Sequence, residues 1–519
     1  MKTLTLLTLL ALCALLYAQT ELQTMLVFES PTDGTYDGHF GENISGNGDL
    51  NGDGFSDIVI PGHPLGEPED ERRLYIYLGG AQPDSVADYI IDVPPVDPGD
   101  MDSFGRFIAY DGDLNGDGYN DLVVAAPTYD GHFPDAGMVF IYWGGETLST
   151  TPDVVLDGLD YGDDCWGLKF GSDLDTSGDL NGDGYDDLVI GSPGPSYYWN
   201  GQVDIFFGGD QFDTEVDWHL QGDYCELFGD NVATGDINGD GYDDLAVSQE
   251  IANSDYMQFQ IYTGGETIST TASYVSDNIY STNICQLFMN GDLNGDGLSD
   301  LIMINSTASG TMNVLLGDVY LDSVLLTYQL EGALRVVECF YSVFDNTCMI
   351  GGSSPLDSMI VFFEYVDEDS LITQYCRSFQ SNGYSSAAYN VGDFNGDGHG
   401  DILQSSFEDS DNWQICILTT EYVDIGDEPS PHPSLAFACF PNPTRGGATV
   451  RFSLAQAGPV DAAVYNTRGQ RVATLAAGHS FTAGEHTLRW DAGDAASGIY
   501  LVRMAHALGS TTSKLVLLK

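Results

Sequence analysis

The chain has 519 residues, of which 79 are Asp or Glu and only 15 are Lys or Arg, so its formal net charge is −64. A chain of this length accommodates one large domain and a small additional one. The charge argues against nucleic acid as a partner, because binding to phosphate backbones requires Lys and Arg.

The N-terminus has the features of a secretory signal peptide, which we place at residues 1–18. Lys2 is followed by an apolar stretch from Leu4 to Leu16, as signal peptides require. This stretch is too short to span a bilayer, and no later segment has the composition of a transmembrane helix. A lipoprotein signal ending at Cys13 is the alternative, although Leu12 occupies the position where a small residue is expected. Either interpretation predicts an exported protein.

A nine-residue phrase, Asp-Xaa-Asn-Xaa-Asp-Gly-Xaa-Xaa-Asp, occurs six times. Its copies begin at Asp49, Asp113, Asp179, Asp236, Asp292 and Asp393. Side-chain oxygens at positions 1, 3, 5 and 9, with the backbone carbonyl of position 7, suit Ca²⁺ better than octahedral Mg²⁺. Soft metals are not expected, because no Cys or His is among the side-chain ligands. An Asx-rich turn without metal is the alternative.

The six loops predict about six structural Ca²⁺ sites. The expected ligands are Asp49, Asn51, Asp53, Phe55 and Asp57; Asp113, Asn115, Asp117, Tyr119 and Asp121; Asp179, Asn181, Asp183, Tyr185 and Asp187; Asp236, Asn238, Asp240, Tyr242 and Asp244; Asp292, Asn294, Asp296, Leu298 and Asp300; and Asp393, Asn395, Asp397, His399 and Asp401. Phe55, Tyr119, Tyr185, Tyr242, Leu298 and His399 occupy position 7 and contribute only their carbonyls.

The loops are not EF-hands, because an EF-hand requires a bidentate Glu at position 12. Position 12 is apolar here, as Ile60, Val124 and Ile190 show. The residues around it form short apolar runs typical of buried strands. Each loop is therefore predicted to join two strands of a hairpin.

Each loop lies within a longer repeated unit. An aromatic-Gly pair precedes it, at Phe40-Gly41, Phe104-Gly105, Phe228-Gly229, and at Trp166-Gly167 or Phe170-Gly171 in the third unit. A small-residue and proline element follows it, as at residues 125–127. An alternating strand that ends in Gly-Gly completes the unit, as at residues 74–80.

These four ordered elements resemble the FG-GAP repeat, which forms the blades of integrin α-subunit propellers. The resemblance covers roughly residues 25–425 and implies an all-β fold, a seven-bladed β-propeller at residues 19–426. The sixth unit keeps its later elements but lacks the acidic loop near residues 344–348. Met25–Phe28 is expected to pair with the last blade and close the ring.

The composition changes after a proline-containing linker at residues 427–434. Residues 435–519 carry eight basic and four acidic residues and read as short strands separated by Gly turns. They include Phe440-Pro441-Asn442-Pro443 and Ser497-Gly498-Ile499-Tyr500, and resemble the C-terminal sorting domain of the type IX secretion system. The resemblance implies a small Ig-like β-sandwich, the type IX machinery as partner, and a location outside the cell or on its surface. A carbohydrate-binding or plain Ig-like module is the alternative.

The sequence contains no nucleophile elbow, zincin motif or P-loop. We therefore expect a monomeric binding or adhesion module for a glycan or an extracellular protein rather than an enzyme. Aromatic and His residues in loops after the proline element are the ligand-binding candidates: Tyr129, His132, Phe133, Tyr197, Tyr198, Trp199, Tyr256 and Trp413. An extracellular lyase, hydrolase or phosphodiesterase that uses the propeller face or channel is one alternative. A purely structural component of the cell surface is another.

Overall fold

The computed structural model shows a chain whose described elements are all β-strands. The structure describes residues 23–29, 45–62, 72–95, 103–130, 134–158, 167–194, 200–222, 227–251, 254, 256–280, 285–305, 311–321, 325–329, 337–341, 348–354, 359–367, 370–377, 384–396, 400–407, 413–419, 437–440, 447–454, 458–466, 471–482, 484–493, 495, 498–506 and 509–517.

The chain divides into two compact units, Met1–Val423 and Asp424–Lys519. The all-β class predicted from the sequence is confirmed, since no described residue lies in a helix. In the described part of the chain, no helix has the length and apolar character needed to cross a membrane. The predicted boundaries at residues 18, 426 and 434 lie outside the described residues and stay predictions.

The described residues of the first unit form seven antiparallel sheets, numbered here in chain order. The first three consist of β2 (Ser45–Gly46), β3 (Ile58–Gly62), β4 (Arg73–Tyr77) and β5 (Tyr89–Asp92); β6 (Phe107–Ala109), β7 (Leu122–Ala126), β8 (Met138–Tyr142) and β9 (Val154–Asp157); and β10 (Asp173–Gly178), β11 (Asp187–Ser192), β12 (Gln202–Phe206) and β13 (Trp218–Gln221).

The next three consist of β14 (Phe228–Gly235), β15 (Asp244–Glu250), β16 (Tyr256–Tyr262), β17 (Tyr274–Val275) and β18 (Ile279–Tyr280); β19 (Cys285–Gly291), β20 (Asp300–Asn305), β21 (Thr311–Leu315) and β22 (Leu326–Gln329); and β23 (Val337–Tyr341), β24 (Cys348–Ser354), β25 (Met359–Asp367) and β26 (Ser370–Arg377). The seventh consists of β27 (Tyr384–Asn390), β28 (Ile402–Phe407), β29 (Trp413–Thr419) and β1 (Gln23–Glu29).

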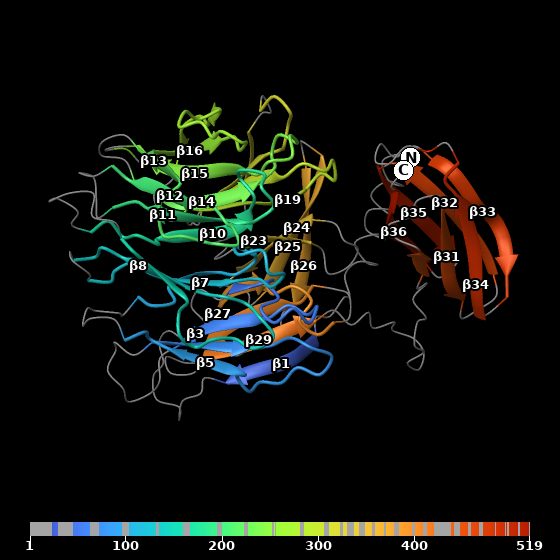
Figure 1. Cartoon of the computed structure of the whole chain (residues 1–519), viewed down its shortest axis with the longest axis horizontal. Helices are drawn as coiled ribbons and strands as arrows, with labels where there is room; N and C mark the ends of the chain where they lie inside the picture. The colour runs from blue at the N-terminus through green and yellow to red at the C-terminus, as the bar shows by residue number, and fades with distance from the viewer. Residues whose placement is uncertain are drawn as a thin grey trace, which may run out of the picture. The chain divides into compact units, whose positions relative to one another are not determined.

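The seventh sheet joins the two ends of the first unit. β1 pairs antiparallel with β29, with Val27 opposite Cys416 and Phe28 opposite Ile415, and the two strands lie side by side in Figure 1. The predicted pairing of Met25–Phe28 with the last sheet is therefore confirmed.

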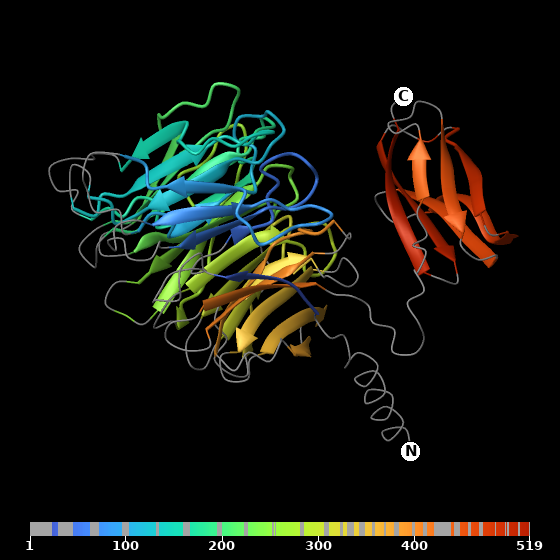
Figure 2. The same ribbon diagram turned by 90° about the horizontal axis from the view of Figure 1, so that it is seen from below.

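The seven sheets follow one another around a ring. The first strand of a sheet contacts the first strand of the next, as β10 does with β6 and β14, and β27 contacts both β23 and β2. The first and second sheets are joined by the Tyr110 hydroxyl, which donates to the Asp57 carbonyl at 2.8 Å. Figure 2 shows the sheets succeeding one another within the unit in chain order. This arrangement is a β-propeller.

The middle strands are buried on both faces, because each sheet is packed between two neighbours. All five residues of β7 are buried. Val124 packs against the first sheet and Val123 against the third, and burial of such a side chain contributes about 1.5–3 kcal/mol. Leu74 to Tyr77 of β4 are all buried for the same reason.

The aromatic-Gly pairs anchor one sheet against its neighbour. In the third unit the pair is Phe170-Gly171, because Phe170 is fully buried. A β-carbon on Gly171 would lie 2.7 Å from the Ala125 Cβ of the second sheet, and its φ of +86° also favours glycine. The glycine thus allows close packing between adjacent sheets.

The strands described in the second unit form two antiparallel sheets. One consists of β30 (Phe437–Phe440), β31 (Gly447–Leu454) and β34 (Gly484–Asp491); the other consists of β33 (Arg471–Phe481), β32 (Gly458–Asn466), β35 (Gly498–His506) and β36 (Gly509–Leu517). Both contribute to one core, in which Phe452 and Trp490 of the first sheet pack with Val464 and Val502 of the second. The unit is therefore a β-sandwich.

Candidate functional site: six acidic loops

Each acidic loop connects the first and second strands of a propeller sheet, in agreement with the prediction that it joins two strands of a hairpin. The loops occur in all sheets but the sixth, which lacks the motif in its sequence. Five loops are described in full, and the loop beginning at Asp393 is described except for residues 397–399. Asp397 and His399 therefore lie outside the described residues.

Within a loop, the position-1 carboxylate accepts hydrogen bonds from three backbone amides. Asp49 Oδ1 accepts from Gly52 N at 2.7 Å and Asp53 N at 3.1 Å, and Asp49 Oδ2 accepts from Gly54 N at 2.7 Å. The Asn51 and Asp53 side chains accept from the amides two residues further on, at 2.9 and 3.0 Å. The loops beginning at Asp113, Asp179, Asp236 and Asp292 repeat this geometry.

The position-9 carboxylate has a different environment. Asp57 is fully buried, and its Oδ2 accepts from Leu50 N at 2.8 Å while its Oδ1 accepts from Gly79 N at 2.9 Å. Gly79 opens the Gly-Gly pair that follows the third strand. Asp57 therefore links the acidic loop to the third strand of its own sheet. The other five position-9 residues are also fully buried: Asp121, Asp187, Asp244, Asp300 and Asp401.

Burial raises the pKa of these carboxyl groups. It raises the pKa of Asp57 from 3.8 to about 7, against the lowering effect of the two backbone hydrogen bonds. The nearby charges of Asp49 and Asp53 raise it further. The pKa values of Asp121, Asp187 and Asp244 are also raised to about 7, and that of Asp300 to about 6. Each loop thus holds three mutually repelling carboxylates, one of them in a poorly hydrated place.

The stability of the metal-free protein should consequently depend on pH. A carboxyl group whose pKa is about 7 when folded and 3.8 when unfolded binds its proton more tightly in the folded state. Stability should therefore be lost as the pH rises from about 4 to about 7, and the melting temperature in EDTA should be lower at about pH 8 than at about pH 5. Excess Ca²⁺ should weaken or reverse this trend, because the metal binds the ionised form. A chelated protein that melts higher at the alkaline pH would contradict this assignment.

The donor set of each loop suits a hard divalent cation in kind, with three carboxylates, one amide and one carbonyl oxygen. In the described conformation the position-1, -3 and -5 oxygens accept from loop amides. No group of three or more His, Cys, Asp or Glu side chains in the described residues has the arrangement to hold a metal ion. A cation at the loop would offset the repulsion from Asp49 and Asp53, which adds to the larger effect of burial on the Asp57 pKa.

The eight ligand-binding candidates differ in their exposure and in whether the structure describes them. Tyr256 is 43% exposed at the start of β16, whereas Tyr129 is only 4% exposed and packs in the core between the first two sheets. The Tyr129 ring is therefore a buried packing residue rather than an exposed one. Trp413 begins β29, but its side chain is not described. The other candidates lie outside the described residues: His132, Phe133, Tyr197, Tyr198 and Trp199.

Sequence reasoning missed Tyr280, which pairs with Tyr256 across β16 and β18. The two rings are 5.7 Å apart in an edge-to-face arrangement, and Tyr280 is 58% exposed. Glu250 at the end of β15 pairs with Met257, while Leu245 beside the acidic loop pairs with Tyr262. The Tyr256–Tyr280 pair therefore lies at the end of the fourth sheet opposite its acidic loop.

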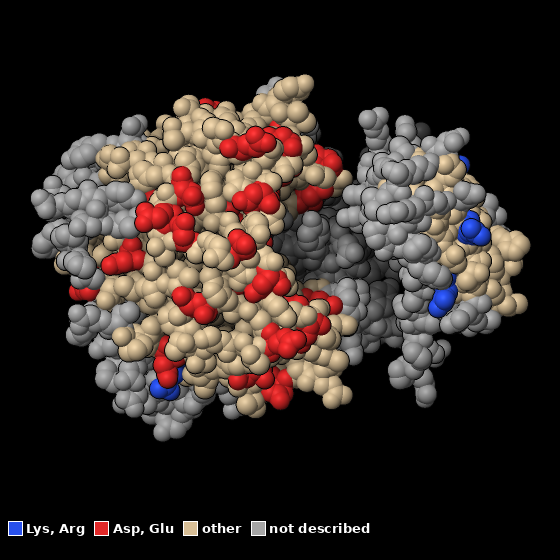
Figure 3. All heavy atoms as spheres, in the orientation of Figure 1, with Lys and Arg blue, Asp and Glu red and all other residues tan. Residues whose placement is uncertain are grey.

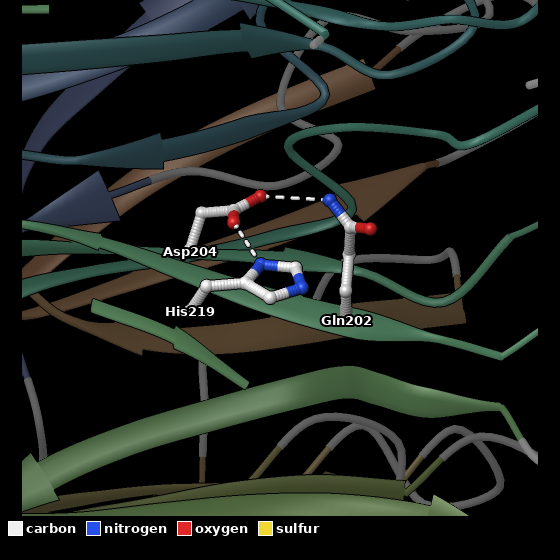
Figure 4. A network of polar contacts seen from close by, with 3 residues as sticks. All are labelled: Gln202, Asp204 and His219. Carbon is white, nitrogen blue, oxygen red and sulfur yellow. Dashed lines mark hydrogen bonds and ion pairs between the residues drawn. The ribbon is translucent and has the colours of Figure 1, made fainter. Parts of the chain in front are cut away.

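A polar network in the third sheet was also not predicted (Figure 4). Asp204 is fully buried; it accepts from Gln202 Nε2 at 2.9 Å, and its Oδ1 is 2.7 Å from His219 Nδ1. A buried carboxylate needs hydrogen-bond partners, and Gln202 and His219 supply them here. The contact with His219 links the outer strand β13 to β12. Only the strand register brings Asp204 opposite His219, so no local sequence pattern predicts this network.

Acidic side chains lie in several separate groups across the face of the first unit shown in Figure 3. Little basic surface accompanies them there. The acidic surface on this face is therefore divided into groups rather than forming a single acidic patch.

The family comparisons bear directly on these loops and strands. A family model described as FG-GAP repeat matches residues 104–142, 170–206 and 228–262, that is, the second, third and fourth sheets from the aromatic-Gly pair to the third strand. The chain contains FG-GAP repeats. A second model, described as secretion system C-terminal sorting domain, matches residues 438–518. The second unit is therefore a type IX sorting domain, and the FG-GAP protein is exported to the cell surface or the extracellular space.

Curated relatives match part of the chain. Integrin alpha-5 of Xenopus laevis is 33% identical over 183 residues, and integrin alpha-PS5 of Drosophila melanogaster is 37% identical over 150 residues. Phosphatidylinositol-glycan-specific phospholipase D of Mus musculus is 32% identical over 201 residues. These matches cover 28–35% of this chain but only 14–23% of the relatives' lengths.

Among solved structures, the WD40 domain from Toxoplasma gondii coronin aligns over 81% of this chain and 93% of its own. The sequence identity is 12% and the TM-score 0.44. The similarity is too low to support a conclusion about function.

Proposed function

We propose that this FG-GAP protein is an exported, calcium-stabilised propeller that binds a glycan or an extracellular protein. The observation that carries the calcium part is the repeated loop with its buried position-9 carboxylate. The sorting domain supports action outside the cell, where Ca²⁺ is abundant enough for sites with dissociation constants of about 10⁻⁴–10⁻³ M.

In this proposal each ion is held by the side chains at positions 1, 3, 5 and 9 and by the carbonyl at position 7. In the second sheet these are Asp113, Asn115, Asp117, Asp121 and the carbonyl of Tyr119. The cation offsets the repulsion among the carboxylates and fixes the hairpin between β6 and β7. Its role is structural, and the binding surface lies elsewhere.

The Tyr256–Tyr280 pair is the best-supported binding surface among the described residues. Two exposed rings meet there, and Gln258 Nε2 beside them donates to Asn278 Oδ1 at 3.0 Å. Aromatic faces stack on sugar rings or anchor protein partners, while neighbouring amides supply directional hydrogen bonds. The pair thus offers the chemistry of a sugar-binding or protein-binding surface.

A glycan and extracellular-matrix-protein binding screen with the full chain, with and without Ca²⁺, tests this function. We expect calcium-dependent binding that weakens by about tenfold, or about 1.4 kcal/mol, when Tyr256→Ala and Tyr280→Ala are combined. Tyr320→Ala is the matched control, because Tyr320 is 82% exposed next to a different sheet. No binding to any glycan or protein would leave a purely structural surface component as the better interpretation.

A phosphodiesterase is the second candidate, favoured only by the phospholipase D relative. The relative's name describes that protein, and the matched stretch covers 23% of it. Incubation of the binding hits with the protein separates the two functions, because an enzyme releases product and a binding module returns the ligand intact.

A further inference from the structure

The acidic loops contact one another directly, and five of the six are covered by the loop that follows around the ring. The position-7 side chain of one loop lies on the position-4 glycine of the preceding loop. A β-carbon on Gly52 would lie 2.6 Å from the Tyr119 ring, and Gly239 is likewise covered by Leu298 at 2.6 Å. The same contact joins Gly116 to Tyr185, Gly182 to Tyr242 and Gly396 to Phe55.

Backbone hydrogen bonds reinforce this contact. The position-8 amide of one loop donates to the position-1 carbonyl of the preceding loop, as Asn120 N does to Asp49 O at 3.2 Å and Asp243 N does to Asp179 O at 3.1 Å. The equivalent bonds join Ser56 to Asp393, Asp186 to Asp113 and Ser299 to Asp236. The following loop thus restrains the residue whose carboxylate organises the loop before it.

Three position-8 side chains complete the connection in the opposite direction. They accept from the position-1 amide of the preceding loop: Asp49 N donates to Asn120 Oδ1 at 2.8 Å, Asp113 N to Asp186 Oδ2 at 2.7 Å, and Asp179 N to Asp243 Oδ2 at 2.8 Å. Both backbone groups of these position-1 residues are therefore held by the next sheet.

Within the described residues, the series ends at the loop at residues 292–300. The loop at residues 292–300 precedes the sixth sheet, whose sequence has no acidic loop. Gly295 has a φ of +74°, within the range of 71–74° found at the position-4 glycines, yet no described residue lies within 4 Å of a β-carbon built on it. The loop at 292–300 covers its predecessor through Leu298, but no position-7 side chain of the repeat covers Gly295.

We propose that the loops form a directional series, from residues 393–401 through 49–57 to 292–300, in which each following loop stabilises the one before it. The proposal rests on the calcium function proposed above. In a linear array of units coupled to their nearest neighbours, the terminal unit opens first. The loop at residues 292–300 is consequently the first to release Ca²⁺ and lose its hydrogen-bonded conformation.

Hydrogen exchange of the full chain, measured by mass spectrometry at decreasing free Ca²⁺, tests this order. The amides of Gly295, Asp296 and Gly297 donate to Asp292, and they should lose protection at a higher free Ca²⁺ than the equivalent amides of residues 113–121. Simultaneous or later loss at 292–300 would overturn the series but leave calcium binding standing. Protection that is independent of Ca²⁺ in every loop would overturn both proposals.

A substitution tests the direction of the coupling. Tyr185→Ala removes the ring from Gly116, so exchange should become about fivefold faster in the preceding loop at 113–121, with a smaller effect in its own loop at 179–187. Tyr185→Phe keeps the ring and is the matched control, with exchange close to that of the unaltered protein. An effect confined to residues 179–187 would overturn the directional coupling.

Discussion

Chelation with EDTA should lower the melting temperature of the first unit by about 10 °C. At free Ca²⁺ about ten times the dissociation constant, each site contributes about 1.4 kcal/mol, or roughly 8 kcal/mol for six sites. A unit of this size unfolds with an entropy of about 0.8 kcal/mol/K, which converts that free energy into the expected shift. The physical cause is that, without Ca²⁺, nothing offsets the repulsion among the loop carboxylates, such as that of Asp49 and Asp53 with buried Asp57.

The second unit supplies an internal control for this experiment. Residues 435–519 contain no copy of the acidic loop, so the transition of the β-sandwich should not move when Ca²⁺ is removed. Restoring Ca²⁺ should recover the original melting temperature, whereas Mg²⁺ should recover less because it requires near-ideal octahedral geometry. An unchanged melt of the propeller in EDTA would falsify the calcium proposal.

Asp187→Ala should destabilise the propeller even without Ca²⁺. The substitution removes the acceptor of Leu180 N at 2.8 Å and of Gly208 N at 2.9 Å from a fully buried position. Each buried amide left without a partner costs about 1–3 kcal/mol, so a loss of roughly 2–6 kcal/mol is expected in urea unfolding with EDTA present.

Asp183→Ala is the matched control in the same loop. Asp183 is exposed, and its carboxylate accepts only from Tyr185 N at 3.1 Å and Asn181 Nδ2 at 3.0 Å. Its loss should cost less than about 1 kcal/mol in EDTA and more when Ca²⁺ is present. Equal destabilisation by the two substitutions in EDTA would show that the buried position-9 carboxylate has no role separate from the metal.

The sequence predicted the repeated features because they are local. One acidic loop, the apolar run after it and the Gly-Gly pair all lie within about 30 residues, and their recurrence identified the repeat. The pairing of Met25–Phe28 with the last sheet was predictable for a different reason: a ring of sheets leaves the first strand beside the last.

The features that sequence reasoning missed depend on contacts between sheets. Gly52 and Tyr119 belong to consecutive repeats. From the sequence, the glycine at position 4 is therefore interpreted only as a turn residue, whereas the structure shows that the neighbouring loop packs on it. The exposure of Tyr129 was predicted from its place after the proline element, yet the ring packs in the core beside Phe140 and Met138. Loop position alone therefore does not decide whether an aromatic residue meets a ligand or a neighbouring sheet.

The pairing of β1 with β29 has a consequence for how the chain acquires its structure. Two segments almost 400 residues apart must find each other, and closing a loop of that length costs about 5 kcal/mol of chain entropy. Because β29 follows nearly all of the propeller sequence, a nascent chain cannot complete the ring until the propeller sequence has been synthesised. Such long-range pairing slows folding, so β1 and β29 should pair late in the folding of the propeller.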